Sequence, residues 1–177
     1  MLQMAMKRVK NEKGLTLIEL LAVVVILGIV AAIAIPAIGG LIDRTKKDAH
    51  VANAIQMIAA AKMAVVGDER ARPTATTITK YISLDWLVVN GYLDPVKDPD
   101  GTTNGYSVGT AAATPPPSTV ATAGSHVLAT LTTSTGAISY SVFLKNDTRG
   151  VRETATSTGT AATDYVKEST VNRDAVK

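Results

Sequence analysis

An uninterrupted apolar run at residues 20–42 constrains the fold more than any other feature of the sequence. Its 23 residues contain no charged side chain and no Ser, Thr, Asn or Gln. A helix of this length rises about 35 Å, which is enough to cross a bilayer core of about 30 Å. A helix buried in a soluble protein would carry a polar stripe, and this run has none. We therefore expect the chain to be inserted in a membrane at some stage.

The charges around the apolar run predict its orientation and limit its ligands. The basic residues that precede it place the N-terminus in the cytoplasm by the positive-inside rule; they are Lys7, Arg8, Lys10 and Lys13. Further basic residues within 44–47 reduce this asymmetry. Residues 1–14 hold four of the 18 basic and one of the 15 acidic residues, so the remainder has 14 of each sign. Nucleic acid is therefore not expected as a primary ligand.

The composition excludes several kinds of catalytic and metal site. The chain has no Cys, so it has neither a disulfide framework nor a thiolate zinc site. It has two histidines, His50 and His126, and we expect both to be solvated at the surface. The sequence contains no nucleophile elbow, phosphate loop or pair of catalytic acids. We expect no enzyme activity and no cofactor.

A short motif precedes the apolar run and continues into it. Residues 13–19 read Lys-Gly-Leu-Thr-Leu-Ile-Glu. Gly14 offers an unhindered peptide bond at the membrane face, and Glu19 follows inside an otherwise apolar segment. A carboxylate in hydrocarbon costs several kcal/mol unless it reaches the interface, is protonated or meets a cation. Glu19 therefore either has a function or lies at the interface as the first turn of the helix.

Residues 13–21 resemble the prepilin cleavage and methylation motif of type IV pilins and the related pseudopilins. The resemblance implies that a membrane peptidase cleaves between Gly14 and Leu15 and methylates the new N-terminus at Leu15. Glu19 matches the acidic residue at the fifth mature position, which implies a salt bridge to the amine of a neighbouring subunit. Leu15 departs from the Phe that many members have there. The close resemblance extends over residues 14–66.

Gly28 and Pro36 interrupt the regularity of the apolar helix. Pro36 removes one backbone donor and clashes with the preceding turn, while Gly28 adds backbone freedom. These residues predict a simple bend. The resemblance implies more, because the segment between such positions can melt and extend in assembled pili.

After residue 42 the same helix is expected to become amphipathic and to end at Gly67. Its predicted packing stripe recurs at three- and four-residue steps, and polar residues such as Asp48 and Gln56 lie on other faces. The stripe consists of Ala49, Ala52, Ile55, Ile58 or Ala59, and Met63. We expect it to pack on a globular head.

The head is expected to be a small antiparallel sheet with one short helix. Residues 83–91 predict the helix, with Leu84, Leu87 and Val88 inward and Trp86 at the margin. Residues 126–133 and 137–145 predict a hairpin, with further short strands at residues 106–108 and near residue 165. The fold class is therefore α+β, with a long N-terminal stalk helix whose second half packs on the sheet.

The domain boundaries follow from these segments. Residues 1–14 form a leader peptide that is removed on maturation, and 15–42 form the transmembrane and filament-core helix. Residues 43–67 form the amphipathic half of the stalk, and 68–177 form the α+β head with its Ser/Thr-rich loops.

One loop of the head has two possible interpretations. Asp94, Asp98 and Asp100 place three carboxylates close together, as calcium requires. Asp-Pro and Asp-Gly pairs are also ordinary turn formers, and the pattern of an EF-hand is incomplete. Residues 146–148 match the N-glycosylation sequon, which is a weak signal.

The combined features predict a structural subunit of a type IV pilus-like filament. Its partners would be further copies of itself, a prepilin peptidase and a pilus assembly platform. As a prepilin it would cross the plasma membrane once, and after assembly it would lie at the cell surface. A pseudopilin of a type II secretion or DNA-uptake system, and a membrane-anchored binding module, remain as alternatives.

Overall fold

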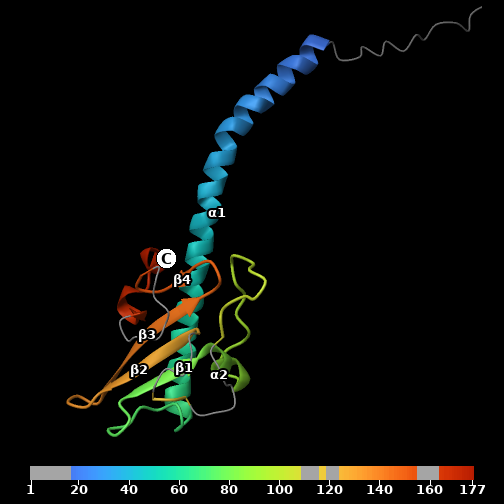
Figure 1. Ribbon diagram of the computed structural model, residues 1–177. Coiled ribbons are helices and arrows are strands. Elements are labelled where there is room, and N and C mark those ends of the chain that lie inside the picture. The colour runs from blue at the N-terminus through green and yellow to red at the C-terminus, as the bar shows by residue number, and fades with distance from the viewer. Residues whose placement is uncertain (1–16, 109–115, 119–123, 155–163) are drawn as a thin grey trace, which may run out of the picture. The chain divides into compact units, whose positions relative to one another are not determined.

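The computed structural model describes residues 17–108, 116–118, 124–154 and 164–177 (Figure 1). The chain divides into two compact units, Met1–Ile42 and Asp43–Lys177. Helix α1, Leu17–Gly67, contributes to both. It continues through Gly28 and Pro36, and it ends at the residue that the sequence predicts.

The described part of the first unit is an apolar helix whose side chains are exposed. Sixteen large apolar residues between Leu17 and Ile42 expose between 47% and 84% of their surface. Among the described residues, α1 is the helix that is long and apolar enough to cross a bilayer. This half of α1 therefore has the surface that lipid or other apolar helices require.

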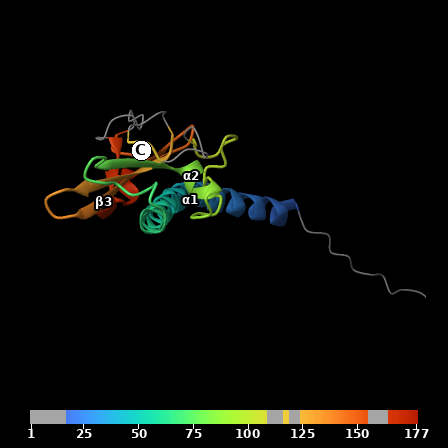
Figure 2. The same ribbon diagram turned by 90° about the horizontal axis from the view of Figure 1, so that it is seen from below.

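The second unit contains an antiparallel five-stranded sheet beside the second half of α1 (Figures 1 and 2). Four strands follow the order β1-β2-β3-β4, and β5 also pairs with β3. The strands are β1 Thr79–Ser83, β2 His126–Thr132, β3 Ala137–Lys145, β4 Gly150–Val151 and β5 Val166–Lys167. Short 3-10 helices, Glu168–Thr170 and Arg173–Ala175, follow β5. The predicted α+β architecture is confirmed.

The hairpin of β2 and β3 has the predicted position. Gly136 closes it with a φ of 70°, a left-handed conformation that glycine adopts without steric cost. The register pairs Val127 with Val142 and Leu131 with Ile138. Strand β1, which pairs with β2, was not predicted from the sequence. The strand predicted at residues 106–108 is wrong, since Val108 forms one isolated bridge to Ser125.

The main core lies between the sheet and one face of α1. From the helix it takes seven residues that are at most 2% exposed: Ala54, Met57, Ile58, Ala60, Ala61, Ala64 and Val65. The predicted packing stripe is mostly wrong: Ile58 is buried, but Ala52, Ile55, Ala59 and Met63 are exposed. The helix has an apolar row on both sides, so periodicity alone could not identify the face that meets the sheet.

Helix α2, Leu84–Val89, begins as predicted. The Ser83 hydroxyl accepts a hydrogen bond from the Trp86 backbone N–H at 3.1 Å and caps the helix. Trp86 is not at the margin, because it is 2% exposed and stacks on Tyr92 with ring centroids 5.6 Å apart. Val88, expected inside, is half-buried.

A second, smaller cluster lies on the opposite face of β3. Phe143 interrupts the polar face of that strand in the sequence, and it packs with Leu128, Tyr165 and Tyr81. Side chains on successive strand residues point to opposite faces, so Phe143 and Val142 enter different clusters. The sheet is therefore covered by apolar contacts on both faces.

Candidate functional site

The N-terminal motif is the first candidate site. Gly14 and Leu15, the predicted cleavage and methylation residues, lie outside the described residues. Glu19 lies in the first turn of α1 and is exposed. Gly28 is also exposed, and an added Cβ there would meet nothing within 4 Å. Between Leu17 and Ile42, Glu19 is the one ionisable residue of the helix.

The position of Glu19 in an apolar helix limits the environments in which its carboxylate can stay charged. The carboxylate at Glu19 is tolerated where it reaches water or headgroups. If apolar helices cover this turn, the carboxylate must be protonated or meet a cation. The motif therefore combines an exposed apolar surface with one carboxylate that needs a proton or a cation wherever apolar helices cover it.

The second candidate site is a polar network in the second unit, centred on Asp100. Arg149 donates two hydrogen bonds to its carboxylate, Nη2 to Oδ1 at 2.6 Å and Nε to Oδ2 at 2.9 Å. A third bond runs from Arg149 Nη1 to Asp43 Oδ1 at 2.5 Å. Arg149 thus connects the loop after β3 with the 98–101 turn and with α1.

His50 continues the network into the interior. It is 0% exposed, and its Nε2 lies 2.9 Å from Asp100 Oδ2. Its Nδ1 lies 2.7 Å from the Tyr106 hydroxyl, which accepts a bond from Asn53 Nδ2 at 2.9 Å. If the tyrosine hydroxyl donates to Nδ1 and Nε2–H donates to Asp100, every member of this chain is satisfied.

Asp98 and Asn146 belong to the same hydrogen-bond network. Asn146 is 5% exposed and donates to Asp98 Oδ1 at 2.8 Å and to Asp100 Oδ2 at 3.1 Å. Its side-chain oxygen, Oδ1, accepts hydrogen bonds from the backbone N–H groups of Thr148 and Arg149. Thr102 donates to Asp98 from both its backbone and its hydroxyl. The sequon asparagine is therefore a buried structural residue, and its amide is already engaged.

The electrostatics of the network favour charged carboxylates. Hydrogen bonds from Arg149 hold the pKa of Asp100 well below its usual range, against the opposing effect of burial. Burial pushes the pKa of Asp98 upward, but the bonds from Thr102 and Asn146 outweigh it and the net pKa is lowered. Burial raises the pKa of Tyr106, which stays protonated.

The structure assembles only part of the predicted carboxylate cluster. Asp98 and Asp100 come together with His50, and their ligand atoms lie within 4.8 Å of one another. Asp94 is exposed and does not join them. The carboxylate oxygens of Asp98 and Asp100 already accept hydrogen bonds from protein donors. Calcium binding remains a prediction, and the observed chemistry is that of an ion-pair and hydrogen-bond network.

Both histidine predictions are wrong. His50 is fully buried in this network, and His126 is 5% exposed at the start of β2. The Nδ1–H of His126 donates to the Gly124 carbonyl at 2.7 Å. Burial lowers the pKa of His126, because the interior disfavours the charged ring.

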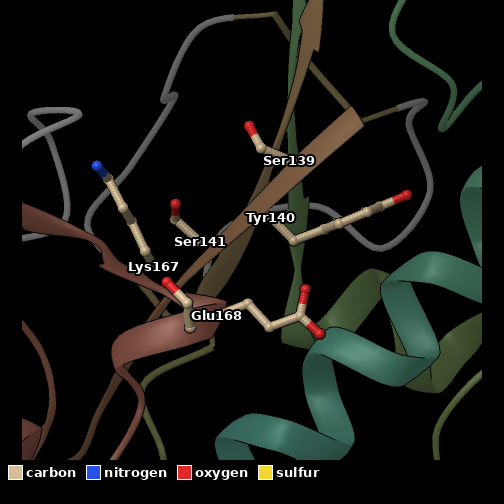
Figure 3. A pocket seen from close by; sticks show the side chains of 6 residues that line it. Ser139, Tyr140, Ser141, Lys167 and Glu168 are labelled. Atoms are coloured by element: carbon tan, nitrogen blue, oxygen red, sulfur yellow. The ribbon is translucent and has the colours of Figure 1, made fainter. Parts of the chain in front are cut away.

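A pocket of about 370 Å³ lies beside β3 and β5 (Figure 3). Figure 3 shows Ser139 and Ser141 on one side of β3 and the Tyr140 ring on the other. Glu168 forms an ion pair with Lys62 of α1, whose ammonium lies 5.5 Å from the centre of the Tyr140 ring. These groups stabilise the sheet against α1 and do not form a nucleophile–base pair.

Residues 9–35 match the family model of the prokaryotic N-terminal methylation motif. No curated protein and no solved structure matches the chain. The chain therefore carries the signature of type IV prepilins and pseudopilins. The match covers the N-terminal motif and supports a type IV pilin- or pseudopilin-like protein, and a motif of this kind generally implies self-assembly and processing by a prepilin peptidase.

Proposed function

We propose that this chain is a structural subunit of a type IV pilus-like filament. The prepilin waits in the plasma membrane with residues 20–42 in the bilayer. The peptidase removes residues 1–14 and methylates Leu15, and an assembly platform then adds the subunit to the filament. Glu19 pairs with the Leu15 amine of a neighbouring copy, while the apolar helices form the filament core.

Glu19 is the observation that carries this proposal. An apolar helix that only anchors a protein gains nothing from a carboxylate in its first exposed turn. A helix that moves from lipid into a bundle of identical helices can use it to fix the axial register, because each carboxylate requires one amine. Buried polar groups set register in this way in other helical assemblies.

The composition of the head favours an exposed fibre over a secretion pseudopilin. Of the 62 residues from 102 to 163, 23 are Ser or Thr. A composition this rich in small polar side chains suits a subunit that faces solvent along a filament. A pseudopilin of a type II secretion or DNA-uptake system, and a membrane-anchored binding module, are the competing functions.

The test combines electron microscopy of sheared surface filaments with peptide mass spectrometry. We expect an abundant fibre whose N-terminal peptide begins at methylated Leu15. Glu19→Ala is expected to be produced, inserted and cleaved but to yield few or no filaments. Glu19→Asp is expected to be milder, because the charge remains and only its reach shortens.

The matched control is Glu69→Ala, which removes an exposed carboxylate of the second unit. It is expected to leave filament yield unchanged. Normal filaments from Glu19→Ala would contradict the salt-bridge mechanism. Loss of that variant from the membrane would show that Glu19 serves insertion or stability instead.

A further inference from the structure

Strand β3 has an unpaired edge at its N-terminal end. On one side, residues 137–143 pair with β2. On the other side, β5 and β4 pair with β3 only from Ser141 onward. Among the described residues, no strand pairs with this side of residues 137–140. We call this side of residues 137–140 the free edge.

The free edge presents backbone groups without a partner strand. In β2, the Leu131 N–H donates to the residue that precedes β1, and the residues of a strand direct their backbone groups to alternate sides. Thr130 therefore faces β3, where it pairs with Ser139. It follows that Ile138 and Tyr140 direct their N–H and C=O groups to the free edge. No backbone hydrogen bond from the described residues reaches these groups.

The opposite edge of the sheet is covered by the chain itself. In β1, the Tyr81 N–H donates to the Pro117 carbonyl at 3.0 Å, and the Thr79 hydroxyl donates to the Ser118 carbonyl at 3.1 Å. Natural sheets protect their edges by cover of this kind, or by a proline, a charge or a bulge on the strand. Residues 137–140 contain neither a proline nor a charge. The free edge is therefore a template for a further strand.

The pocket of about 370 Å³ lies where β5 turns away from β3 (Figure 3). Val166 and Lys167 pair with β3, and the chain then enters the 3-10 helix Glu168–Thr170. Residues of β3 and of this turn line the pocket. The pocket therefore provides space beside the free edge, along the path that a longer β5 would take.

The pocket also contains a cation that is available to a ligand. Glu168 is paired with Lys62, whereas Lys167 is exposed and forms no ion pair within the described part of the chain. Lys167 lies directly opposite Ser141, so its side chain is on the face of β3 that carries Ser139 and Ser141. A guest residue opposite Ser139 would point to the same face. An acidic side chain at that position would pair with the Lys167 ammonium.

We propose that the free edge binds an extended, acidic segment of a different protein, which adds to β3 as a further strand. The inference goes beyond the proposed filament, because it assigns a ligand site to the second unit. Backbone hydrogen bonds would supply the affinity, and Lys167 would select the sequence.

A second copy of this chain does not fit the site. Two copies of one edge can meet only about a two-fold axis, whereas the copies in a helical filament are joined by unlike surfaces. The other edge of the sheet is already covered at Tyr81 and Thr79. The site therefore requires an extended segment from another protein.

The first test measures amide hydrogen exchange by NMR on the full-length, unassembled chain in detergent micelles. The probe is the peptide Thr-Val-Asp-Val-Thr with blocked ends, which places its Asp opposite Ser139 and its Val residues opposite Ile138 and Tyr140. At millimolar concentration it should protect the amides of Ile138 and Tyr140. The Val142 amide, which faces β5, should be protected with or without the peptide. The control peptide carries N-methylated valines, which removes the facing donors and keeps the charge, and it should protect neither residue.

Two variants test the edge and its cation separately. Ile138→Pro removes an N–H that faces outward, where an edge strand tolerates proline, and should weaken binding of the acidic probe by about fivefold or more. Lys167→Glu should weaken it by about two- to fivefold and should favour the matched peptide with Lys in place of Asp. Lys97→Glu reverses an exposed charge outside the pocket and should change neither affinity. If circular dichroism shows that Ile138→Pro is unfolded, Lys167→Glu and the N-methylated peptide decide.

Several results would overturn the inference. One is an acidic probe that leaves Ile138 and Tyr140 unprotected, or an N-methylated peptide that protects them equally. Amides that are already protected in the unassembled chain would show that the chain covers its own edge. Protection that appears only in sheared filaments, without any peptide, would show that a second copy occupies it. The peptide tests need no filaments, so a failure of the proposed function would leave them interpretable.

Discussion

The two halves of helix α1 are both apolar, but they differ in what they contact. Residues 17–42 expose sixteen large apolar side chains, whereas eight residues between His50 and Val65 are buried within the second unit. The second half is also held by ion pairs that its Asp43, Lys46 and Asp48 form with residues outside the helix. The comparison shows how one helix can serve two environments: specific polar contacts hold one part in its own fold, and the other part remains available to lipid or to other copies.

A block of leader cleavage is expected to have the largest effect, because an uncleaved prepilin keeps the first half of α1 in the membrane. Gly14→Val places a branched side chain at the bond that the peptidase must reach in an extended conformation. We expect an uncleaved prepilin that stays in the membrane, measured by the mass of the N-terminal peptide. A mature N-terminus at Leu15 in this variant would show that the cleavage assignment is wrong.

Separating the halves should leave the second unit intact. We expect a fragment of residues 43–177 to be a soluble monomer with mixed helix and strand, since its core lies within that unit. Circular dichroism and analytical ultracentrifugation measure this directly. An unfolded or insoluble fragment would mean that the second unit needs residues 1–42 to fold.

Breaking the polar network should destabilise that fragment strongly. Arg149→Leu leaves the Asp100 carboxylate, whose side chain is 9% exposed, without its main cation. Removal of one partner of a buried pair costs about 3–5 kcal/mol in the free energy of unfolding. The control is Arg173→Leu, which breaks an exposed pair to Asp48 and should cost much less. Equal losses in urea denaturation would contradict a special role for the network.

Two methionines of α1 sharpen the comparison between its inner and outer faces. Met57 is 0% exposed and Met63 is 57% exposed. In the same fragment, Met57→Ala should lower the free energy of unfolding by about 2–5 kcal/mol because it leaves a cavity. Met63→Ala should change it by less than about 0.5 kcal/mol. A comparable loss in both variants would mean that the side of α1 that carries Met63 is already covered within the second unit.

The sequence allowed the helix, the hairpin and the N-terminal motif to be predicted, because each has a local signal. The motif occupies a few adjacent residues, and the 126–145 hairpin combines two β-prone runs with a Gly-containing turn. The predicted packing face of α1 was mostly wrong because both faces are apolar, and the choice between them depends on the sheet. The spacing of apolar residues along the helix does not show which of its two faces packs on the sheet.

The polar network could not be predicted for a related reason. Arg149 meets Asp100 across 49 residues and Asp43 across 106 residues. Each partner alone is an ordinary polar residue of a loop or of a helix surface. His50 was assigned to the surface on the same grounds, although the fold encloses it between Asp100 and Tyr106. Contacts between residues that lie far apart in the sequence can be identified only once the fold is known.

The smallest expected effect is the pH dependence of the second unit. Burial lowers the pKa of His126 below the value of about 6.5 that an unfolded chain has. The unfolded state therefore binds a proton more readily, so stability from the neutral ring is present above about pH 6.5 and is lost as the pH falls toward the folded-state pKa.

His126→Asn keeps a donor for the Gly124 carbonyl but cannot titrate in this range. In urea denaturation of residues 43–177 at several pH values, this variant should lose less stability than the wild type between about pH 7 and pH 5. An identical slope in the two proteins would show that His126 is accessible to protons in the folded state without cost, which would contradict its buried position beside β3.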